Sequence, residues 1–133
     1  MTRRLKLTAP ARQDLLDLKQ DDVALVRGAL RVAKRIERGE IDGVALRDFG
    51  KTGDLRDCRK VYFGAEPGAD THRIVFRILA GGEVEIVEIV AVAQREADVA
   101  YLQAALRLER IEDPVPRSDA QRRIHRSRRR RPR

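Results

Sequence analysis

The longest run of regularly spaced apolar residues covers residues 83–108, and its period changes partway along. Its first part places valine, isoleucine and alanine on both faces of an extended chain, which is typical of a central strand. After Arg95 the period becomes helical, with Asp98 as the expected N-cap. The residues expected on one face of the strand are Val84, Ile86, Val90 and Val92. Arg95 is therefore expected at the rim of a sheet.

The residues before this strand predict a short strand and two helices. Residues 3–7 alternate between polar and apolar side chains, as in a strand. Thr8 is placed to cap a first helix, with Pro10 in its first turn. A second helix is expected to begin at Asp21-Asp22, to carry apolar residues three and four positions apart, and to end at Gly39.

Three strands are expected in the second half of the chain, at residues 56–63, 72–79 and 83–92. Ala-Gly-Gly at residues 80–82 predicts a tight hairpin turn, and residues 64–71, with a proline and two glycines, predict a longer hairpin loop. The order strand, helix, helix, three strands and helix indicates an α+β fold.

The formal net charge of +8 belongs to one end of the chain. Residues 117–133 hold nine arginines and one acid, so the remainder is neutral overall. We expect one domain over residues 1–113 and a disordered basic tail over residues 114–133, because the tail has too few apolar residues to form a core. The tail could bind RNA through phosphate contacts, or serve only solubility or an acidic partner. Its candidate nucleic-acid-binding residues are Arg122, Arg123, Arg126, Arg128, Arg129, Arg130 and Arg131.

Composition excludes several classes of protein. No run of residues approaches the ~20 apolar positions of a membrane span, and no signal peptide is evident. Cys58 is the single cysteine, so an intrachain disulfide is impossible and a cytoplasmic protein is expected. Cysteine and histidine do not occur with metal-ligand spacing, so neither a metal nor a cofactor is expected.

Residues 91–101 (AVAQREADVAY) resemble the end of RelE-type toxins, in which a tyrosine follows an arginine by six positions. Arg95 and Tyr101 keep that spacing. Residues 57–61 and 72–77 are similar to two strands of the same family. The resemblance to the RelE/ParE superfamily implies two N-terminal helices packed on a small, mainly antiparallel four-stranded sheet, with a C-terminal helix.

The resemblance also implies a function. RelE-like toxins are metal-independent endoribonucleases that cut messenger RNA on the ribosome, inhibit translation, and are held in hetero-oligomers by a cognate antitoxin. The matching catalytic positions here are Lys60, Arg73, Arg95 and Tyr101. The two arginines suit the phosphate. Neighbouring cations are expected to lower the pKa of Lys60 toward that of a general base, and Tyr101 would stack on a base or orient the 2′-hydroxyl.

Tyr62 departs from the family pattern, because many members carry a second lysine there. A phenol can donate a hydrogen bond or stack, but it brings no positive charge. Tyr62 and Arg59 are therefore auxiliary candidates. Two other functions stay open: a ParE-like toxin that inhibits gyrase without cutting nucleic acid, and a non-toxic member that binds RNA or protein. Structural roles are also open, including an ion pair between Arg73 and an acid such as Asp57 or Glu85.

Overall fold

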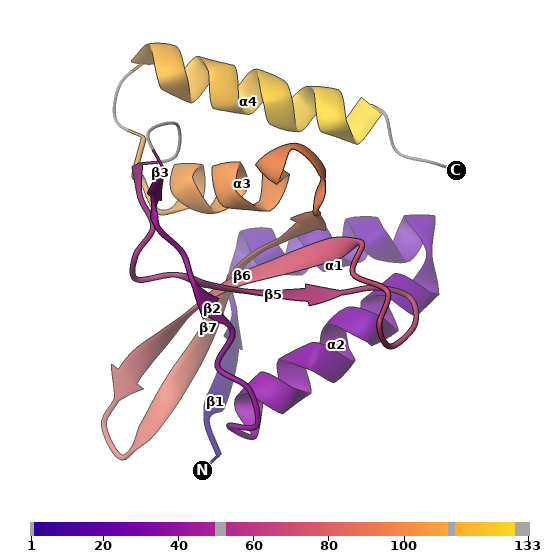
Figure 1. Ribbon diagram of the computed structural model, residues 1–133, viewed down its shortest axis with the longest axis vertical. Helices are drawn as coiled ribbons and strands as arrows, with labels where there is room; N and C mark the ends of the chain where they lie inside the picture. Colours follow the sequence, from indigo (N-terminus) through magenta and orange to yellow (C-terminus); the bar gives the residue numbers. More distant parts are fainter. Residues whose placement is uncertain (1, 50–52, 112–113, 130–133) are drawn as a thin grey trace.

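A mixed five-stranded sheet is the centre of the α+β fold seen in the computed structural model, which describes residues 2–49, 53–111 and 114–129 (Figure 1). Its strand order is β1-β7-β6-β5-β2, with β1 parallel to β7 and the other neighbours antiparallel. The strands are β1 (Arg4–Leu7), β2 (Val44–Ala45), β5 (Arg59–Phe63), β6 (His72–Gly81) and β7 (Val84–Gln94). The four strands expected from the sequence are present, and β2 adds a fifth. A separate ribbon pairs β3 (Asp48–Phe49) with β4 (Gly53–Asp54).

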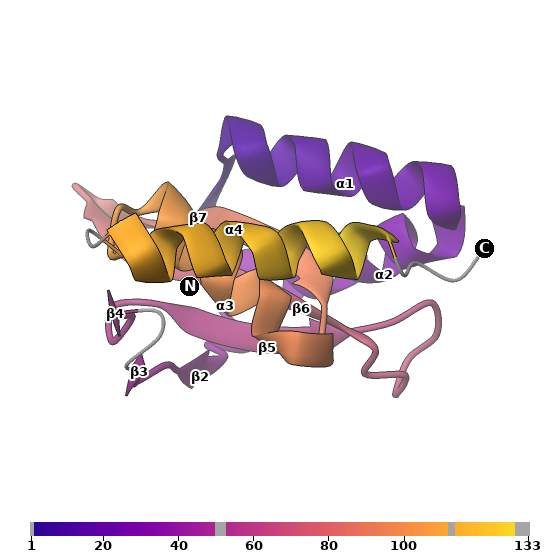
Figure 2. The same cartoon turned by 90° about the horizontal axis from the view of Figure 1, so that it is seen from above.

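Helices cover both faces of the sheet and form two cores. The helices are α1 (Ala9–Asp21), α2 (Val23–Glu37), α3 (Val99–Arg107) and α4 (Pro114–Arg129), with a short 3₁₀ turn, η1 (Glu96–Asp98), before α3. One core lies between the sheet and α1 with α2, and the other lies between the sheet and α3 with α4. Figures 1 and 2 show α4 lying along α3, on the side away from the sheet. No helix within the described ranges is long and apolar enough to cross a membrane.

The predicted helix ends are confirmed for α1 and α2. The Thr8 hydroxyl accepts a hydrogen bond from the Ala11 backbone N–H at 3.2 Å, and Pro10 lies in the first turn. The Asp22 carboxylate accepts from the Ala24 N–H at 2.9 Å. Gly39 follows α2 with a φ of 75°, a left-handed conformation that glycine adopts without a steric penalty.

A β-bulge interrupts β7 near its middle. The pairing register shifts between Val75 and Phe76 of β6, which leaves Val90 as an extra residue in β7. Val90 consequently packs in the core beneath α3, whereas Val92 packs in the core beneath α1 and α2. The prediction that Val90 and Val92 share a face is therefore wrong, because an unbroken alternation does not hold across the bulge.

Asp14 of α1 and Arg107 of α3 satisfy the backbone groups beside this bulge. The Asp14 carboxylate accepts from the two terminal guanidinium nitrogens of Arg107 at 2.6 and 2.8 Å and from the Val92 N–H at 2.9 Å. Arg107 also donates to the Val90 carbonyl at 2.9 Å. Strand β1 ends before this point, so the two side chains take the place of a neighbouring strand. We call them the Asp14–Arg107 pair; it ties α1, β7 and α3 together.

The C-terminal segment differs from the expectation of a disordered tail, because residues 114–129 form α4. Ala120 and Ile124 lie four residues apart and are buried in the core that α3 lines. Two apolar residues one turn apart make a narrow stripe, and the apolar surface of α3 gives that stripe a surface to pack on. Residues 130–133 of the predicted tail lie outside the described residues.

Candidate functional site

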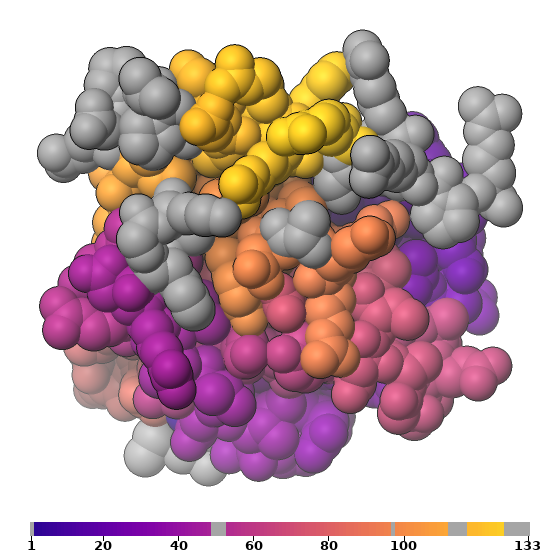
Figure 3. All heavy atoms as spheres, turned by 45° about the horizontal axis from the view of Figure 1, so that its top comes forward, coloured from indigo at the N-terminus to yellow at the C-terminus, as the bar shows by residue number. Residues whose placement is uncertain are grey.

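The structure brings the four residues predicted as catalytic, together with Tyr62, into one group. Lys60 and Tyr62 come from β5, Arg73 from β6, Arg95 from the residue between β7 and η1, and Tyr101 from α3. Tyr62 and Arg73 are directly opposite each other in the antiparallel pairing of β5 and β6. We call these five side chains the Tyr62 cluster. It lies on the sheet face that α3 covers. Figure 3 shows α4 in yellow above α3 in orange.

Tyr62 is contacted by all three cations of the cluster. The Lys60 Nζ donates a hydrogen bond to the Tyr62 hydroxyl at 2.9 Å. The Cζ of Arg95 lies 4.5 Å from the centroid of the Tyr62 ring, and the Cζ of Arg73 lies 5.5 Å from it. Arg73 is closer to the ring of Tyr101, at 4.4 Å. These distances are those of cation–π contacts, so the two rings hold three positive groups near one another.

Burial divides the Tyr62 cluster into an inner and an outer part. Tyr101 and Arg73 are buried, with exposed fractions of 5% and 8%. Lys60 and Tyr62 are half-buried, and Arg95 is exposed. A bound molecule would therefore meet Arg95, Lys60 and Tyr62 first, while Arg73 and Tyr101 support them from below.

Arg73 forms an ion pair with Asp98, in which Nη1 lies 2.8 Å from the carboxylate. Asp98 was expected to cap the helix through its side chain; it occupies the N-cap position of α3 but makes no capping hydrogen bond, since its carboxylate accepts from Arg73 instead. Its φ of 55° is left-handed. The Nε of Arg73 is buried and has no hydrogen-bond partner among the described residues. Arg73 thus keeps a donor that no protein group in the described chain uses.

The acids considered as partners for Arg73 pair elsewhere. Asp57 accepts from Arg110 at 2.7 and 2.9 Å, and Glu85 pairs with Arg3 at 3.3 Å. Arg73 therefore pairs with Asp98 and not with either of these acids, and the Asp98 side chain is 65% exposed to solvent.

The hydrogen bond between Lys60 and Tyr62 shifts the pKa of both groups. It is the largest cause that raises the pKa of Lys60, and a contact with Tyr101 acts in the same direction. The same bond lowers the pKa of the Tyr62 phenol. The prediction that neighbouring cations lower the pKa of Lys60 is therefore wrong, because two phenol oxygens stabilise its ammonium form. Lys60 is a cation at neutral pH, and Tyr62 is the group moved toward the neutral range.

Arg59 lies outside the Tyr62 cluster, although it was an auxiliary candidate. Its guanidinium donates to the backbone carbonyls of Asp42 and Gly43 at 3.3 and 3.5 Å. It therefore holds the segment that leads into β2. Alternation along β5 explains the difference, because neighbouring residues of a strand point to opposite faces.

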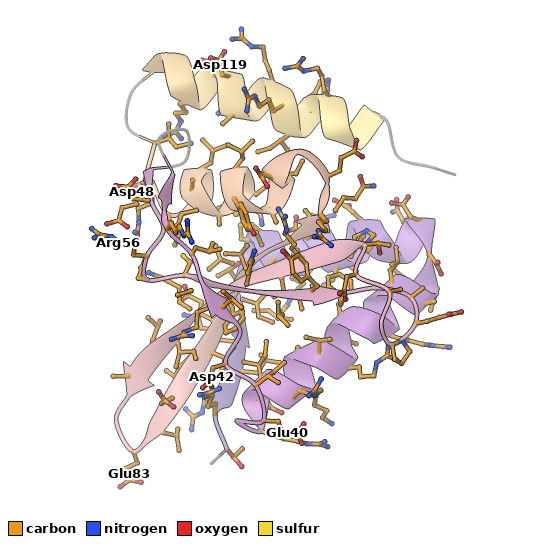
Figure 4. All side chains as sticks on the ribbon, viewed as in Figure 1. Glu40, Asp42, Asp48, Arg56, Glu83 and Asp119 are labelled. Carbon is orange, nitrogen blue, oxygen red and sulfur yellow. The ribbon has the colours of Figure 1, made fainter. Side chains whose placement is uncertain are left out.

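The tail arginines lie on α4 as far as the structure describes them. Arg122 and Arg126 are exposed and Arg123 is half-buried. Arg122 pairs with Asp119, which Figure 4 labels on the outer surface of α4. Arg128 and Arg129 belong to the last turn of the helix. Arg130 and Arg131 lie outside the described residues.

Sequence reasoning missed Asp98 as the partner of Arg73 and missed the Asp14–Arg107 pair. Asp14 carried a usable signal, because it lies three residues after Ala11 and four before Leu18, on the buried face of α1. A carboxylate on an apolar face indicates a buried partner. Asp98 carried no such signal, since an aspartate before a helix is ordinary capping chemistry.

Comparison of the chain with protein-family models, with curated proteins and with solved structures found no match. Among the described residues, no group of three or more histidine, cysteine, aspartate or glutamate side chains is placed to hold a metal ion. The groups that the site offers for chemistry are three cations and two phenols.

Proposed function

We propose that this protein is a RelE-like toxin: an endoribonuclease that cuts messenger RNA on cytoplasmic ribosomes and is neutralised by an antitoxin in a hetero-oligomer. The observation that carries the proposal is the convergence of Lys60, Arg73, Arg95 and Tyr101, from four separate segments, around Tyr62. A phosphodiester in the reaction carries negative charge on its non-bridging oxygens, and three cations around two aromatic rings suit a phosphate flanked by bases.

The proposed reaction uses the RNA's own 2′-hydroxyl. Its oxygen bonds to the adjacent phosphorus as the bond from phosphorus to the 5′-oxygen breaks, giving a 2′,3′-cyclic phosphate and a free 5′-hydroxyl. One proton leaves the 2′-oxygen and one reaches the 5′-oxygen, so no other reactant is needed. Arg73 and Arg95 hold the phosphate oxygens, because a planar guanidinium can donate two parallel hydrogen bonds to them.

In this proposal Tyr62 takes the role of general base. The Lys60 ammonium donates to its hydroxyl at 2.9 Å and lowers its pKa, which increases the phenolate fraction at neutral pH. Lys60 stays charged and adds to the positive field around the phosphate. Tyr62 thus takes the role of base that the resemblance gave to Lys60, while Lys60 keeps its positive charge.

A second candidate function is RNA binding without cleavage. The raised pKa of Lys60 favours it, because the resemblance gives the role of base to Lys60, and a lysine held as an ammonium ion cannot accept a proton. The Tyr62 cluster would then bind a phosphate and its bases without reaction.

One experiment tests the proposal against its alternatives. Purified protein is added to ribosomes translating a defined message, and cut positions are mapped for wild type and Tyr62→Phe. We expect cuts by wild type and at least a hundredfold loss in Tyr62→Phe, which keeps the ring and removes the base. Binding of ribosomes with no cuts by wild type would support the second candidate. Inhibition of gyrase supercoiling by wild type would support a ParE-like toxin.

A further inference from the structure

A cavity of about 250 Å³ lies beside the Tyr62 cluster, between α2 and the loop of residues 64–71. Arg31 and Arg35 line it from α2, and Glu66 and Asp70 line it from the loop. Tyr62 also lines it, so the cavity and the cluster share one side chain. The cavity and the cluster are therefore adjacent.

Close backbone contacts give the cavity its shape. A Cβ atom added at Gly28 of α2 would lie 1.9 Å from the Gly64 carbonyl oxygen, so only glycine permits this approach of helix and loop. A Cβ atom at Gly64 would lie 2.0 Å from the Ala69 carbonyl oxygen. The loop is thus packed tightly against both α2 and itself, and the cavity wall is fixed by backbone.

The cavity is also located at an open edge of the sheet. Strand β2 pairs only with Lys60 and Arg59 of β5. The outer side of β5 at Tyr62 and Phe63 therefore has no strand neighbour in the described part of the chain. A ligand can approach this edge from solvent, between the loop and α2.

We propose that this cavity binds the nucleotide next to the cut phosphate and selects a base that carries an exocyclic amino group. The inference rests on the proposed function, and it adds a substrate preference to it. At about 250 Å³ the cavity is smaller than the ~300–1,000 Å³ of sites that enclose a drug-sized ligand, so it suits the base of one nucleotide, with the sugar and phosphate at its open side.

The charges around the cavity match the two ends of a nucleotide. Arg31 belongs to no ion pair within the described residues, so its guanidinium is available to a phosphate. Arg35 is held by Glu40 at 3.4 Å. Glu66 and Asp70 are exposed carboxylates that can accept hydrogen bonds from the amino groups of adenine, cytosine or guanine. At the position of the cytosine amino group uracil presents a carbonyl oxygen, which the two carboxylates repel.

The test measures binding of RNA that cannot be cut. Labelled 2′-O-methyl hexamers of adenosine, cytidine or uridine lack the 2′-hydroxyl nucleophile, and their affinities are measured by fluorescence anisotropy. We compare wild type with Arg31→Ala and with Glu66→Gln/Asp70→Asn. The matched controls are Arg27→Ala, an exposed arginine one turn earlier on α2 that does not line the cavity, and Glu83→Gln, at the tip of the β6–β7 hairpin (Figure 4).

We expect wild type to prefer the adenosine and cytidine hexamers over uridine. Arg31→Ala should weaken all three by about tenfold, the loss of one charge-assisted hydrogen bond, and Glu66→Gln/Asp70→Asn should remove the preference. Equal effects of Arg31→Ala and Arg27→Ala, an unchanged preference in the double variant, or no binding by wild type would each overturn the inference. Cleavage of ribosome-bound RNA is measured separately. If RNA binding depends on the cavity but no cleavage occurs, the proposed nuclease activity is wrong and the cavity is still a nucleotide-binding site.

Discussion

Two arginine–aspartate pairs in this molecule differ in geometry and in surroundings: Arg107 donates to both oxygens of Asp14, whereas Arg73 donates to one oxygen of Asp98. In the Asp14–Arg107 pair the carboxylate side chain is 4% exposed and each of its oxygens accepts a hydrogen bond. In the pair of Arg73 with Asp98 the carboxylate is 65% exposed and the Arg73 Nε has no partner in the described chain. The first pair is committed to holding three elements together. The second keeps an unused donor beside an open carboxylate, so the comparison separates a structural ion pair from one that can exchange partners.

The largest expected effect comes from breaking the buried pair. Asp14→Ala should lower the free energy of unfolding by about 3–5 kcal/mol, because it leaves the Arg107 guanidinium and the Val92 N–H without their acceptor. Urea denaturation measures the change. Asp17→Ala removes a carboxylate of the same helix that, among the described residues, accepts a hydrogen bond from Gln13 alone, and it should change stability by less than about 0.5 kcal/mol. Similar decreases in the free energy of unfolding of the two variants would show that the buried pair contributes no more to stability than an exposed carboxylate does.

Arg95 lies in the same cluster as the Arg73–Asp98 pair, and its substitution tests the function of that cluster. Arg95→Ala should reduce cleavage of a ribosome-bound message by about 10²–10³, the usual cost of one preorganised charge-stabilising donor. Its melting curve should stay close to wild type, because an exposed residue contributes little to stability. Arg95→Lys should recover little activity, since a point charge does not reproduce the two-donor geometry. Unfolding of Arg95→Ala would instead identify a structural arginine.

The pH dependence of cleavage should follow Tyr62. Its pKa is lowered by the hydrogen bond from Lys60, so the rising limb of kcat/KM against pH should begin below that of an ordinary phenol. In Lys60→Gln that stabilisation of the phenolate is lost, the pKa of Tyr62 rises, and the limb should move to higher pH. Lys60→Arg keeps a cation and should move it less. If the rising limb of both variants stays at the pH of the wild-type limb, Tyr62 is excluded as the base.

The smallest expected effect concerns Asp98. Asp98→Asn removes the charge that holds Arg73, and asparagine tolerates the left-handed φ of 55°. Binding of 2′-O-methyl RNA should become about two- to fivefold tighter, in keeping with the modest strength of exposed ion pairs. Glu96→Gln, in the same 3₁₀ turn, is the control and should leave binding unchanged. Weaker binding in Asp98→Asn would mean that Asp98 positions Arg73 for the RNA.

Local rules predicted much of the fold, because the features they read lie close together in the chain. The caps at Thr8 and Asp22 and the end of α2 at Gly39 follow from single residues and their neighbours. The bulge at Val90 could not be read this way, since it is defined by pairing with β6. The helix at residues 114–129 was missed because its apolar stripe has only two buried members, Ala120 and Ile124, which have meaning only beside α3.

The sequence also predicted part of the candidate site. The resemblance picked out Lys60, Arg73, Arg95 and Tyr101, and the structure places them together. The pKa of Lys60 was predicted in the wrong direction, because that prediction counted charges and not the phenol oxygen 2.9 Å away. Lys60 and Tyr62 lie two positions apart on β5 and so share a face, but their hydrogen bond also depends on side-chain rotamers, which spacing and composition do not determine.

The single extra residue of β7 reverses which side chains point to which face of the sheet. Up to Ile89, odd-numbered positions point to α1 and α2; from Val92 onward, even-numbered positions do. In a variant lacking Val90 the alternation would be unbroken, and each side chain of residues 91–94 would point to the opposite face of the sheet. Arg95 follows directly on that segment, so its route into the Tyr62 cluster depends on the length of β7 as much as on its own identity. Related chains that conserve every side chain of the cluster but differ by one residue in this strand should therefore differ in where the arginine lies.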